Sequence, residues 1–575
     1  MNRVKKHCKT EVRLRPELEY VAGMHRKKSL LRSLSCLAWG LGLGLVAMQA
    51  CESAPETTAA ASAPETMAAA SGGFLVAAEC ARCHSHSPTA NALTTALGDD
   101  ASPHGLWQAT PMANSFRDPY WRAQMAREVE AQPDSRADIE GLCLRCHAPM
   151  AVHAAELSGQ SSPSMASLQE NPLAQDGVSC ALCHRVQPDG LGEPTSFGGQ
   201  VKILEDKRIF GPYSDPTPGP MRMNTGYTPT AAQHISSSAL CGACHTLYTS
   251  HAPGAQPFLE QAPYLEWRNS VFSDEQAPSS ESRSCQQCHM PDMGTMKIAR
   301  MPTGDDFNIA IRDNVRGHVL VGGNAWLIDL LRLNAAELGV TASPAALLRS
   351  AAATRSQLAF DSARLAIEGA QRTERGLDFD LAVTNLAGHK LPSGYPARRA
   401  WLQVEVRSGR TVLFTSGSFD EQGRLSGIAD EFDIPHVDRV ERESDVPVYE
   451  MVASDAKGKH TTSVLDMAAR KKDTRLLPRG WRRDGPHADE TAPVGIGEDA
   501  NFTDGGDRVS YSVHFNEPHP ERLIVVAWLR YQPMPPAWVD SLRSSRTPEA
   551  QAFLRMYAAA ALQPETLALA IHGVE

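Results

Sequence analysis

Five short segments of this chain combine two thiols and one imidazole in the same order and spacing. Each reads Cys-x-x-Cys-His, and together they use ten of the thirteen cysteines. In chain order they are motif 1 (Cys80, Cys83, His84), motif 2 (Cys143, Cys146, His147), motif 3 (Cys180, Cys183, His184), motif 4 (Cys241, Cys244, His245) and motif 5 (Cys285, Cys288, His289). In c-type haem attachment, two thiols bond to one porphyrin and the histidine that follows binds its iron. The motifs therefore predict five covalently bound haem c groups.

Paired cysteines have other uses, which leaves two alternatives to haem. Four-cysteine zinc sites would take the pairs two at a time and leave one over, and zinc does not require a histidine after every second cysteine. Redox-active or disulfide-forming pairs give no reason for the histidine either. Haem attachment accounts for all three residues of each motif.

Each iron has a second axial position, which can hold histidine, hold methionine or stay open. Two candidate histidines lie in loops next to predicted helices or strands, two lie close to motifs in the chain, and one precedes Trp107. These candidate distal ligands are His104, His153, His234, His318 and His389. For each, the alternative is a surface, turn-stabilising or propionate-binding histidine. Lys390, Arg398 and Arg399 are either propionate partners or solvated charges on a turn.

The amino-terminal region has the layout of a secretory signal. A basic stretch after Met24 precedes an apolar run over about residues 36–50, which is too short for an ordinary membrane span. The run ends at Cys51 in a sequence similar to a bacterial lipobox, so Cys51 is a candidate lipid anchor; ordinary cleavage nearby is the alternative. We expect a leader and signal over 1–51, with the true start at 1 or 24, and a low-complexity tether over 52–72.

Periodicity divides the remaining chain into four parts. Residues 73–302 are rich in loops, and we expect short helices to carry the motifs and the haems to supply much of the core. Residues 303–358 have apolar residues at helical spacing, and 359–533 alternate with period two, which predicts an antiparallel β-sandwich. C-terminal helices are expected over 534–575. The fold class is therefore α+β and multidomain: a loop-rich, mainly helical cytochrome domain, a helical connector, the sandwich and the final helices.

Longer phrases resemble one group of proteins. They lie at residues 107–121, 176–184, 237–249 and 285–291, and in the second half at 387–406, 472–481 and 531–538. They resemble exported bacterial multihaem cytochromes c of the cytochrome c-552 and c-554 type, distantly similar to hydroxylamine oxidoreductase and pentahaem nitrite reductase. The resemblance implies a periplasmic or cell-surface electron carrier with mostly bis-histidine haems. The chain has no motif with lysine in place of histidine and no clear tyrosine crosslink phrase, which favours electron transfer over catalysis.

These observations predict an exported pentahaem cytochrome that carries electrons in a periplasmic or outer-membrane respiratory chain. The expected partners are other cytochromes or quinol-linked donors, and the expected location is the periplasm or the cell surface, as an outer-membrane lipoprotein. A net charge of −10 without a basic cluster beyond the signal argues against nucleic acid. The alternative is a multihaem oxidoreductase that acts on a small nitrogen compound at a five-coordinate haem; no catalytic residue is assigned. A third hypothesis is that the sandwich is a docking module.

Overall fold

The computed structural model describes residues 72–252, 254–517, 519, 521–560 and 563–575. The expectations for the signal, for Cys51 and for nearly all of the tether fall on residues 1–71 and so lie outside the described residues. Among the described helices, none combines the length and the apolar character needed to cross a bilayer.

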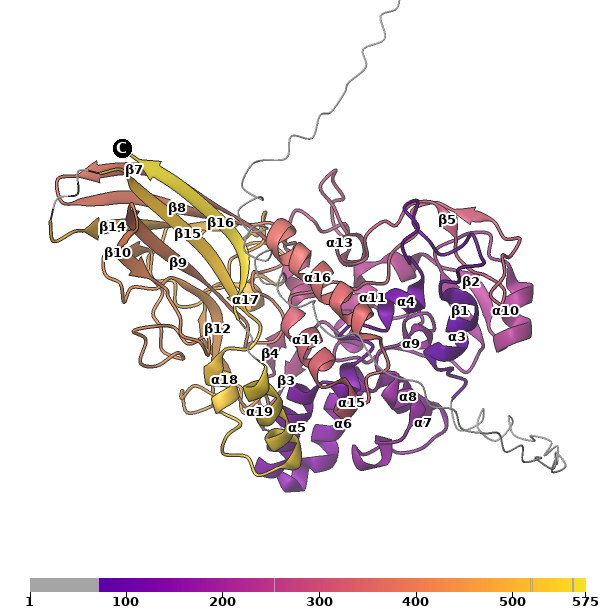
Figure 1. Ribbon diagram of the computed structural model, residues 1–575. Coiled ribbons are helices and arrows are strands. Elements are labelled where there is room, and N and C mark those ends of the chain that lie inside the picture. The colour runs from indigo at the N-terminus through magenta and orange to yellow at the C-terminus, as the bar shows by residue number, and fades with distance from the viewer. Residues whose placement is uncertain (1–71, 253, 518, 520, 561–562) are drawn as a thin grey trace, which may run out of the picture. The chain divides into compact units, whose positions relative to one another are not determined.

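The first half consists of short helices joined by loops (Figure 1). The helices are α3 (Ala77–His84), α4 (Pro103–Trp107), α5 (Pro119–Ala131), α6 (Arg136–His147), α7 (Pro149–Leu157), α8 (Pro172–Gln175), α9 (Cys180–Cys183), α10 (Pro218–Thr225), α11 (Ser238–Gly242), α12 (Pro263–Arg268) and α13 (Cys285–His289). Three two-stranded sheets accompany them, formed by β1 (Arg208–Gly211) with β2 (Thr228–Ala231), β3 (Leu247–Thr249) with β4 (Phe258–Gln261), and β5 (Met296–Lys297) with β6 (Ile311–Arg312).

This half has more of a side-chain core than its loop-rich sequence indicates. Leu144 of α6 and Met150 and Val152 of α7 are completely buried, and they pack with Phe116 and with Leu182 of α9. A side-chain cap stabilises the start of α5, since the Asp118 side chain accepts from two backbone N–H groups in its first turn. The expectation that the haems supply much of the core therefore needs correction for the α5–α9 region.

Three helices connect the halves, as the apolar spacing predicts: α14 (Ala325–Leu333), α15 (Ala335–Leu338) and α16 (Pro344–Asp361). Ser343 caps α16 by accepting from the Ala346 N–H, and Pro344 fits its first turn because a first-turn N–H has no helical partner. The helix α16 contacts both α4 and strand β16, so it lies between the two halves (Figure 1).

The second half is a sandwich of two antiparallel layers (Figure 1). Its strands are β7 (Ala363–Thr373), β8 (Gly376–Asn385), β9 (Arg399–Ser408), β10 (Thr411–Ser416), β11 (Arg439–Val440), β12 (Val448–Ser454), β13 (Ala469–Asp473), β14 (Gly506–His514), β15 (Leu523–Gln532) and β16 (Glu565–Val574). One sheet has the order β13-β12-β9-β15-β16, with β10 paired to β9, and the other has the order β11-β14-β8-β7. Among the described strands of the sandwich, only the short β11–β14 pair is parallel.

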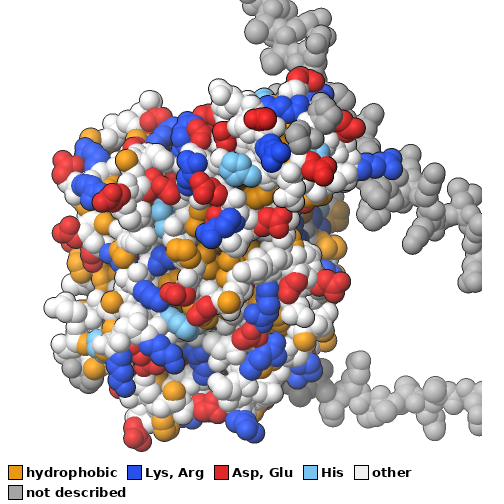
Figure 2. Space-filling model, turned by 90° about the vertical axis from the view of Figure 1, so that its left-hand side faces the viewer, with side chains coloured by type: hydrophobic (Ala, Val, Ile, Leu, Met, Phe, Trp, Pro, Cys, Tyr) orange, Lys and Arg blue, Asp and Glu red, His pale blue; other side chains and the backbone are white. Residues whose placement is uncertain are grey.

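The period-two pattern explains the sandwich core. Along β8, Leu377, Phe379, Leu381 and Val383 are buried, while the intervening residues are exposed or half-buried. Alternate residues of β9, β14 and β15 complete the same core. At the end of the sandwich, acidic and basic side chains are interspersed (Figure 2). The structure confirms the α+β class.

The carboxy-terminal region differs from the expected run of helices. It contains α18 (Pro536–Asp540) and α19 (Pro548–Ala559), but its last segment is strand β16, which pairs with β15 from Leu523↔Val574 to Tyr531↔Glu565. The physical reason is that β15 would otherwise present an unpaired edge, and β16 also places Leu567 in the sandwich core. A short helix α17 (Ala488–Thr491) lies between β13 and β14.

A second core crosses between the halves. Tyr120 of α5 packs with Trp326 of α14 and with Phe553 and Met556 of α19 in one buried cluster. The Tyr120 hydroxyl also forms a 3.0 Å hydrogen bond with the Tyr395 hydroxyl, which belongs to the turn between β8 and β9. This turn therefore reaches from the sandwich into the first half.

Candidate haem-binding centre

The motifs lie on helices, as predicted. Motifs 1, 2 and 5 are the last residues of α3, α6 and α13, while α9 contains both cysteines of motif 3 and α11 contains the first cysteine of motif 4. Residues three and four positions apart share one face of a helix. A helical Cys-x-x-Cys-His segment therefore presents both thiols and the imidazole on the same side, as attachment to one porphyrin requires.

Four of the five motif histidines donate a hydrogen bond from Nδ1 to a backbone carbonyl. The distances are 2.9 Å from His84 to Ile298, 2.9 Å from His147 to Ser115, 2.6 Å from His184 to Phe210 and 2.5 Å from His289 to Val321. Because a carbonyl only accepts, the proton sits on Nδ1 in each ring. The neutral ring then has a free lone pair on Nε2, the arrangement of a metal-binding histidine with a hydrogen-bonded second nitrogen.

Burial keeps these imidazoles in the neutral form. It lowers the pKa of His147 to about 4, against the opposing effect of the Ser115 carbonyl. Burial also lowers the pKa of His245 to about 4, and the nearby His289, Arg398 and His389 add to the effect. The protonated ring has no lone pair for a metal, so burial favours the form that can bind iron.

Two histidines from distant parts of the chain face motif histidines. The ring centroids of His184 and His318 lie 6.4 Å apart with planes 22° apart. Those of His289 and His389 lie 6.3 Å apart with planes 14° apart. His318 and His389 each use Nδ1 to donate to a backbone carbonyl, at 3.1 and 2.8 Å, which leaves their Nε2 atoms free as well.

The spacing of both pairs fits one iron ion between two imidazoles. Two nitrogens bound at about 2.0 Å on opposite sides of a metal place the ring centroids about 6.3 Å apart. Direct packing of the rings would bring them closer, as in the Trp121–His147 pair at 4.2 Å. The residues present therefore fit the haem iron that the motifs imply.

Comparisons with known proteins agree with this geometry. Residues 79–185 match the family model described as cytochrome c554 and c-prime. The fold is similar to that of a penta-heme cytochrome c552 from Thermochromatium tepidum, with a TM-score of 0.50 and 14% sequence identity, covering 88% of this chain and 100% of that chain. No curated protein matches the chain.

Together with the five motifs, these comparisons support a multihaem cytochrome of the c type. They agree with the expected family and with haem c as the cofactor.

The other three candidate distal ligands of the cytochrome have different neighbours. His153 is buried, its Nδ1 lies 2.8 Å from Glu156 Oε2, and its Nε2 is buried without a hydrogen-bond partner among the described residues. His234 donates from Nε2 to the Val186 carbonyl at 2.8 Å, so only its Nδ1 is free. The ring of His104 lies 5.9 Å from that of Trp107. Within the described ranges, none of the three forms a ring pair with a motif histidine, and their assignment stays a prediction.

Contacts between thiols show which motifs of the cytochrome are neighbours. Cys180 contacts Cys80 and raises the pKa of its thiol, and Cys285 does the same to Cys241. Cys146 likewise contacts Cys244 and raises its pKa, and Cys244 also adds to the raised pKa of Cys183, behind burial. In the haem-loaded protein these sulfurs are thioethers and carry no proton, so the pKa shifts matter here only because they show which thiols lie close together. Motif 1 adjoins motif 3, motif 3 adjoins motif 4, and motif 4 adjoins motifs 2 and 5.

The sequence did not predict the contact of Trp121 with a motif histidine, and it left the partners of three charged residues undecided. Trp121 of α5 stacks on the His147 ring, and nothing in the spacing of α5 indicates this. Lys390 and Arg399 are neither solvated nor free for propionates, since they form buried ion pairs with Asp473 at 2.7 Å and Glu431 at 3.0 Å. Arg398, in contrast, is close enough to His245 to contribute to its lowered pKa.

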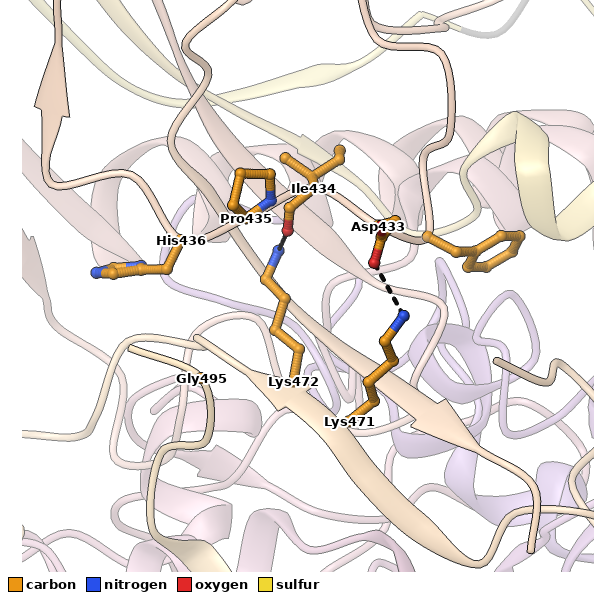
Figure 3. Close-up of a pocket in the computed structure, with 8 residues that line it drawn as sticks. Asp433, Ile434, Pro435, His436, Lys471, Lys472 and Gly495 are labelled. Atoms are coloured by element: carbon orange, nitrogen blue, oxygen red, sulfur yellow. Dashed lines mark hydrogen bonds and ion pairs between the residues drawn. The ribbon is translucent and has the colours of Figure 1, made fainter. Parts of the chain in front are cut away.

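A cavity of about 430 Å³ in the sandwich lies away from the motifs. The close-up shows its cations already paired (Figure 3). Lys471 Nζ lies 2.9 Å from Asp433 Oδ1, and Lys472 Nζ donates to the Ile434 carbonyl at 2.7 Å. His436 Nε2 lies 2.7 Å from Asp499 Oδ2. No cysteine lines this cavity, so it is not a haem attachment site.

Proposed function

We propose that the cytochrome binds five haem c groups and carries electrons between partner proteins outside the cytoplasm. The observation that supports the proposal most directly is that two pairs of imidazoles lie at the spacing of two histidine ligands on one iron. These pairs are His184–His318 and His289–His389. When bound, haem supplies an iron that alternates between the ferric and ferrous states. Filled axial positions favour electron transfer over binding of a substrate to iron.

The contacts between motifs support an electron path through the protein. Motifs 1, 3, 4 and 5 form a continuous series, and motif 2 joins it at motif 4. Motif 4 is then the junction of the series, although it is fourth in the chain. The protein's contribution is to hold the attachment sites adjacent, so that an electron can move between neighbouring haems.

Haem content and internal electron transfer test the proposal together. The mass of the mature protein should equal the chain plus five haems, and replacing both cysteines of one motif by alanine should remove one. The variant without motif 4 should then equilibrate electrons between motifs 1 and 5 far more slowly than wild type after flash reduction. The matched variant without motif 1 should leave transfer among motifs 2, 3, 4 and 5 unchanged. A retained fifth haem would contradict the proposal, and so would wild-type rates of transfer between motifs 1 and 5 in the variant without motif 4.

Export and anchoring rest on the amino-terminal pattern and on the extracytoplasmic attachment of c-type haem. We propose an outer-membrane lipoprotein anchored through Cys51, acting in a respiratory chain with other cytochromes or quinol-linked donors. Cell fractionation checks the anchor: Cys51→Ser should move the haem-loaded protein from the membrane fraction to the periplasm. Cytoplasmic or unchanged membrane localisation of that variant would rule the anchor out.

Redox chemistry on a small nitrogen compound is a second candidate function. The observation that favours it is the environment of His245, which forms no ring pair with another histidine among the described residues and lies close to Arg398. An iron at motif 4 with an open position would be five-coordinate and high-spin. The electron paramagnetic resonance (EPR) spectrum of the oxidised protein decides: a high-spin signal supports this candidate, and five low-spin signals exclude it.

A further inference from the structure

His389 is contributed by the sandwich to a motif in the other half of the chain. It lies in the turn between β8 and β9, and its ring is opposite His289 of motif 5. Gly388 precedes it directly, and Pro392, Gly394 and Pro396 follow in the same turn. Because the glycine leaves the backbone free next to His389, contacts from outside the turn are needed to fix the orientation of the imidazole.

One hold comes from helix α12 of the first half. The fully buried Glu266 side chain accepts at Oε2 from the Lys390 backbone N–H at 3.1 Å and from the Ser393 hydroxyl at 2.5 Å. Its Oε1 lies 3.0 Å from Arg475 Nη1. One carboxylate therefore binds the turn at two residues: the one directly after His389 and another three positions further on.

The second hold comes from the sandwich itself. Lys390 Nζ lies 2.7 Å from Asp473 Oδ2, and both side chains are 0% exposed. Arg475 donates to the two oxygens of Asp473 at 2.8 Å each. Two carboxylates and two cations thus form a buried group in which each charge is paired, the condition under which burial is tolerated. The half-buried Arg470 also approaches Asp473, with its Nη1 3.5 Å from Oδ2.

The imidazole is coupled directly to this group. His389 Nδ1 donates to the Lys390 carbonyl at 2.8 Å, and Asn385 Nδ2 donates to the His389 carbonyl at 2.8 Å. The ring orientation therefore follows the backbone at residues 389 and 390. Glu266 holds the Lys390 N–H, so a shift of that carboxylate relative to the turn moves the ring.

We propose that the buried ionic network of Glu266, Lys390, Asp473 and Arg475 is a positioning device that holds His389 at the second axial position of the motif 5 iron. The proposal rests on the proposed function, in which His289 and His389 are the ligands of that iron. It gives the sandwich a specific role: its turn completes a haem centre whose cysteines belong to the other half. The four network residues are positioning residues, since they act through His389.

The test uses the full-length, haem-loaded protein and the spin state of its irons. Glu266→Gln keeps the size of the side chain and removes the charge that holds the turn. We expect the EPR spectrum to gain high-spin signal equal to about one haem, while the other low-spin signals stay unchanged. Added imidazole should restore the low-spin form. A low-spin spectrum identical to wild type would overturn the proposal.

A matched control separates positioning from loss of a buried charge. Glu431→Gln is the same substitution at a buried glutamate of the sandwich, which, like Glu266, lies 3.0 Å from an arginine, here Arg399. It should leave all haems as in wild type. High-spin signal of equal size in this control would show a general effect of destabilisation and would overturn the proposal.

Two further variants keep the result interpretable. His389→Gly should give the one-haem high-spin signal and recover with imidazole; if it does not, the ligand assignment fails rather than the positioning network. Ser393→Ala removes only the 2.5 Å bond to Glu266 and decides the matter if Glu266→Gln does not assemble. It should increase carbon monoxide binding to one reduced haem relative to wild type, and unchanged binding would overturn the proposal.

Discussion

The indole of Trp121 lies parallel to the imidazole of His147, with ring centroids 4.2 Å apart and planes 3° apart. Both rings are held from the same segment. The Asp118 carboxylate accepts from the Trp121 backbone N–H at 3.2 Å, and the Ser115 carbonyl accepts from His147 Nδ1 at 2.9 Å. Residues 115–121 therefore determine the orientation of the motif 2 imidazole, one of the features by which a protein tunes haem iron.

Replacing Trp121 tests that relationship. Trp121→Leu removes the stacked surface, which contributes about 0.5–1.5 kcal/mol beyond its buried area. We expect the EPR g values and the midpoint potential of one haem to change while the haem number stays the same. Trp326→Leu is the control, because Trp326 packs on Phe553 and Tyr557 instead of a motif histidine. Identical spectra for the two variants would contradict the role of Trp121.

His318 gives a second prediction, at motif 3. His318→Gly should leave the motif 3 iron without its second imidazole, so about one haem becomes high-spin, and added imidazole should reverse the change. His572→Gly, at an exposed histidine of β16, should leave the spin state of every haem as in wild type. If His318→Gly retains the wild-type EPR spectrum, His318 is not a ligand.

The carboxyl group of Glu260 predicts a pH dependence of stability. Burial raises its pKa from 4.5 to about 8, with Arg398 opposing part of the shift, and its Oε2 has no hydrogen-bond partner among the described residues. Between these pH values the folded chain holds a proton that the unfolded chain has released. The free energy of unfolding should therefore fall as the pH rises through this window, by on the order of 5 kcal/mol.

Chemical denaturation at several pH values measures this dependence. Glu260→Gln carries no ionisable proton at that position, so it should flatten the decline and become more stable than wild type above the folded-state pKa. Glu441→Gln, at an exposed surface glutamate, should retain the wild-type slope. A slope that Glu260→Gln leaves unchanged would assign the pH dependence to another group.

The last strand gives a stability prediction with its control in the same strand. Leu567 of β16 is 0% exposed, whereas Leu569 is 51% exposed. Leu567→Ala should lower the free energy of unfolding by about 2–5 kcal/mol, because it leaves a cavity in the sandwich core. Leu569→Ala should change it by less than about 0.5 kcal/mol. Similar losses in the two variants would contradict the strand assignment.

Short-range patterns in the sequence were enough to predict part of the fold and of the haem site. The cysteine spacing predicted the attachment motifs and the haem class, because two thiols and an imidazole on one porphyrin require a fixed short spacing. The helical connector and the alternating strands of the sandwich were predicted for a similar reason, since their residues report the periodicity of a single element. The strand β16 was not predicted, because its assignment depends on the unpaired edge of β15 rather than on its own sequence.

The sequence by itself therefore determined the cofactor chemistry and the main elements of this cytochrome. Only the tertiary structure decided which histidine faces which motif, which motifs adjoin and how the His389 turn is held. His289 and His389 are 100 residues apart, and a loop histidine that meets a distant motif has the same local sequence signal as one on the surface. The physical reason is that these relationships depend on how the sandwich packs against α12, through buried groups such as Glu266 and Lys390 that no local spacing connects.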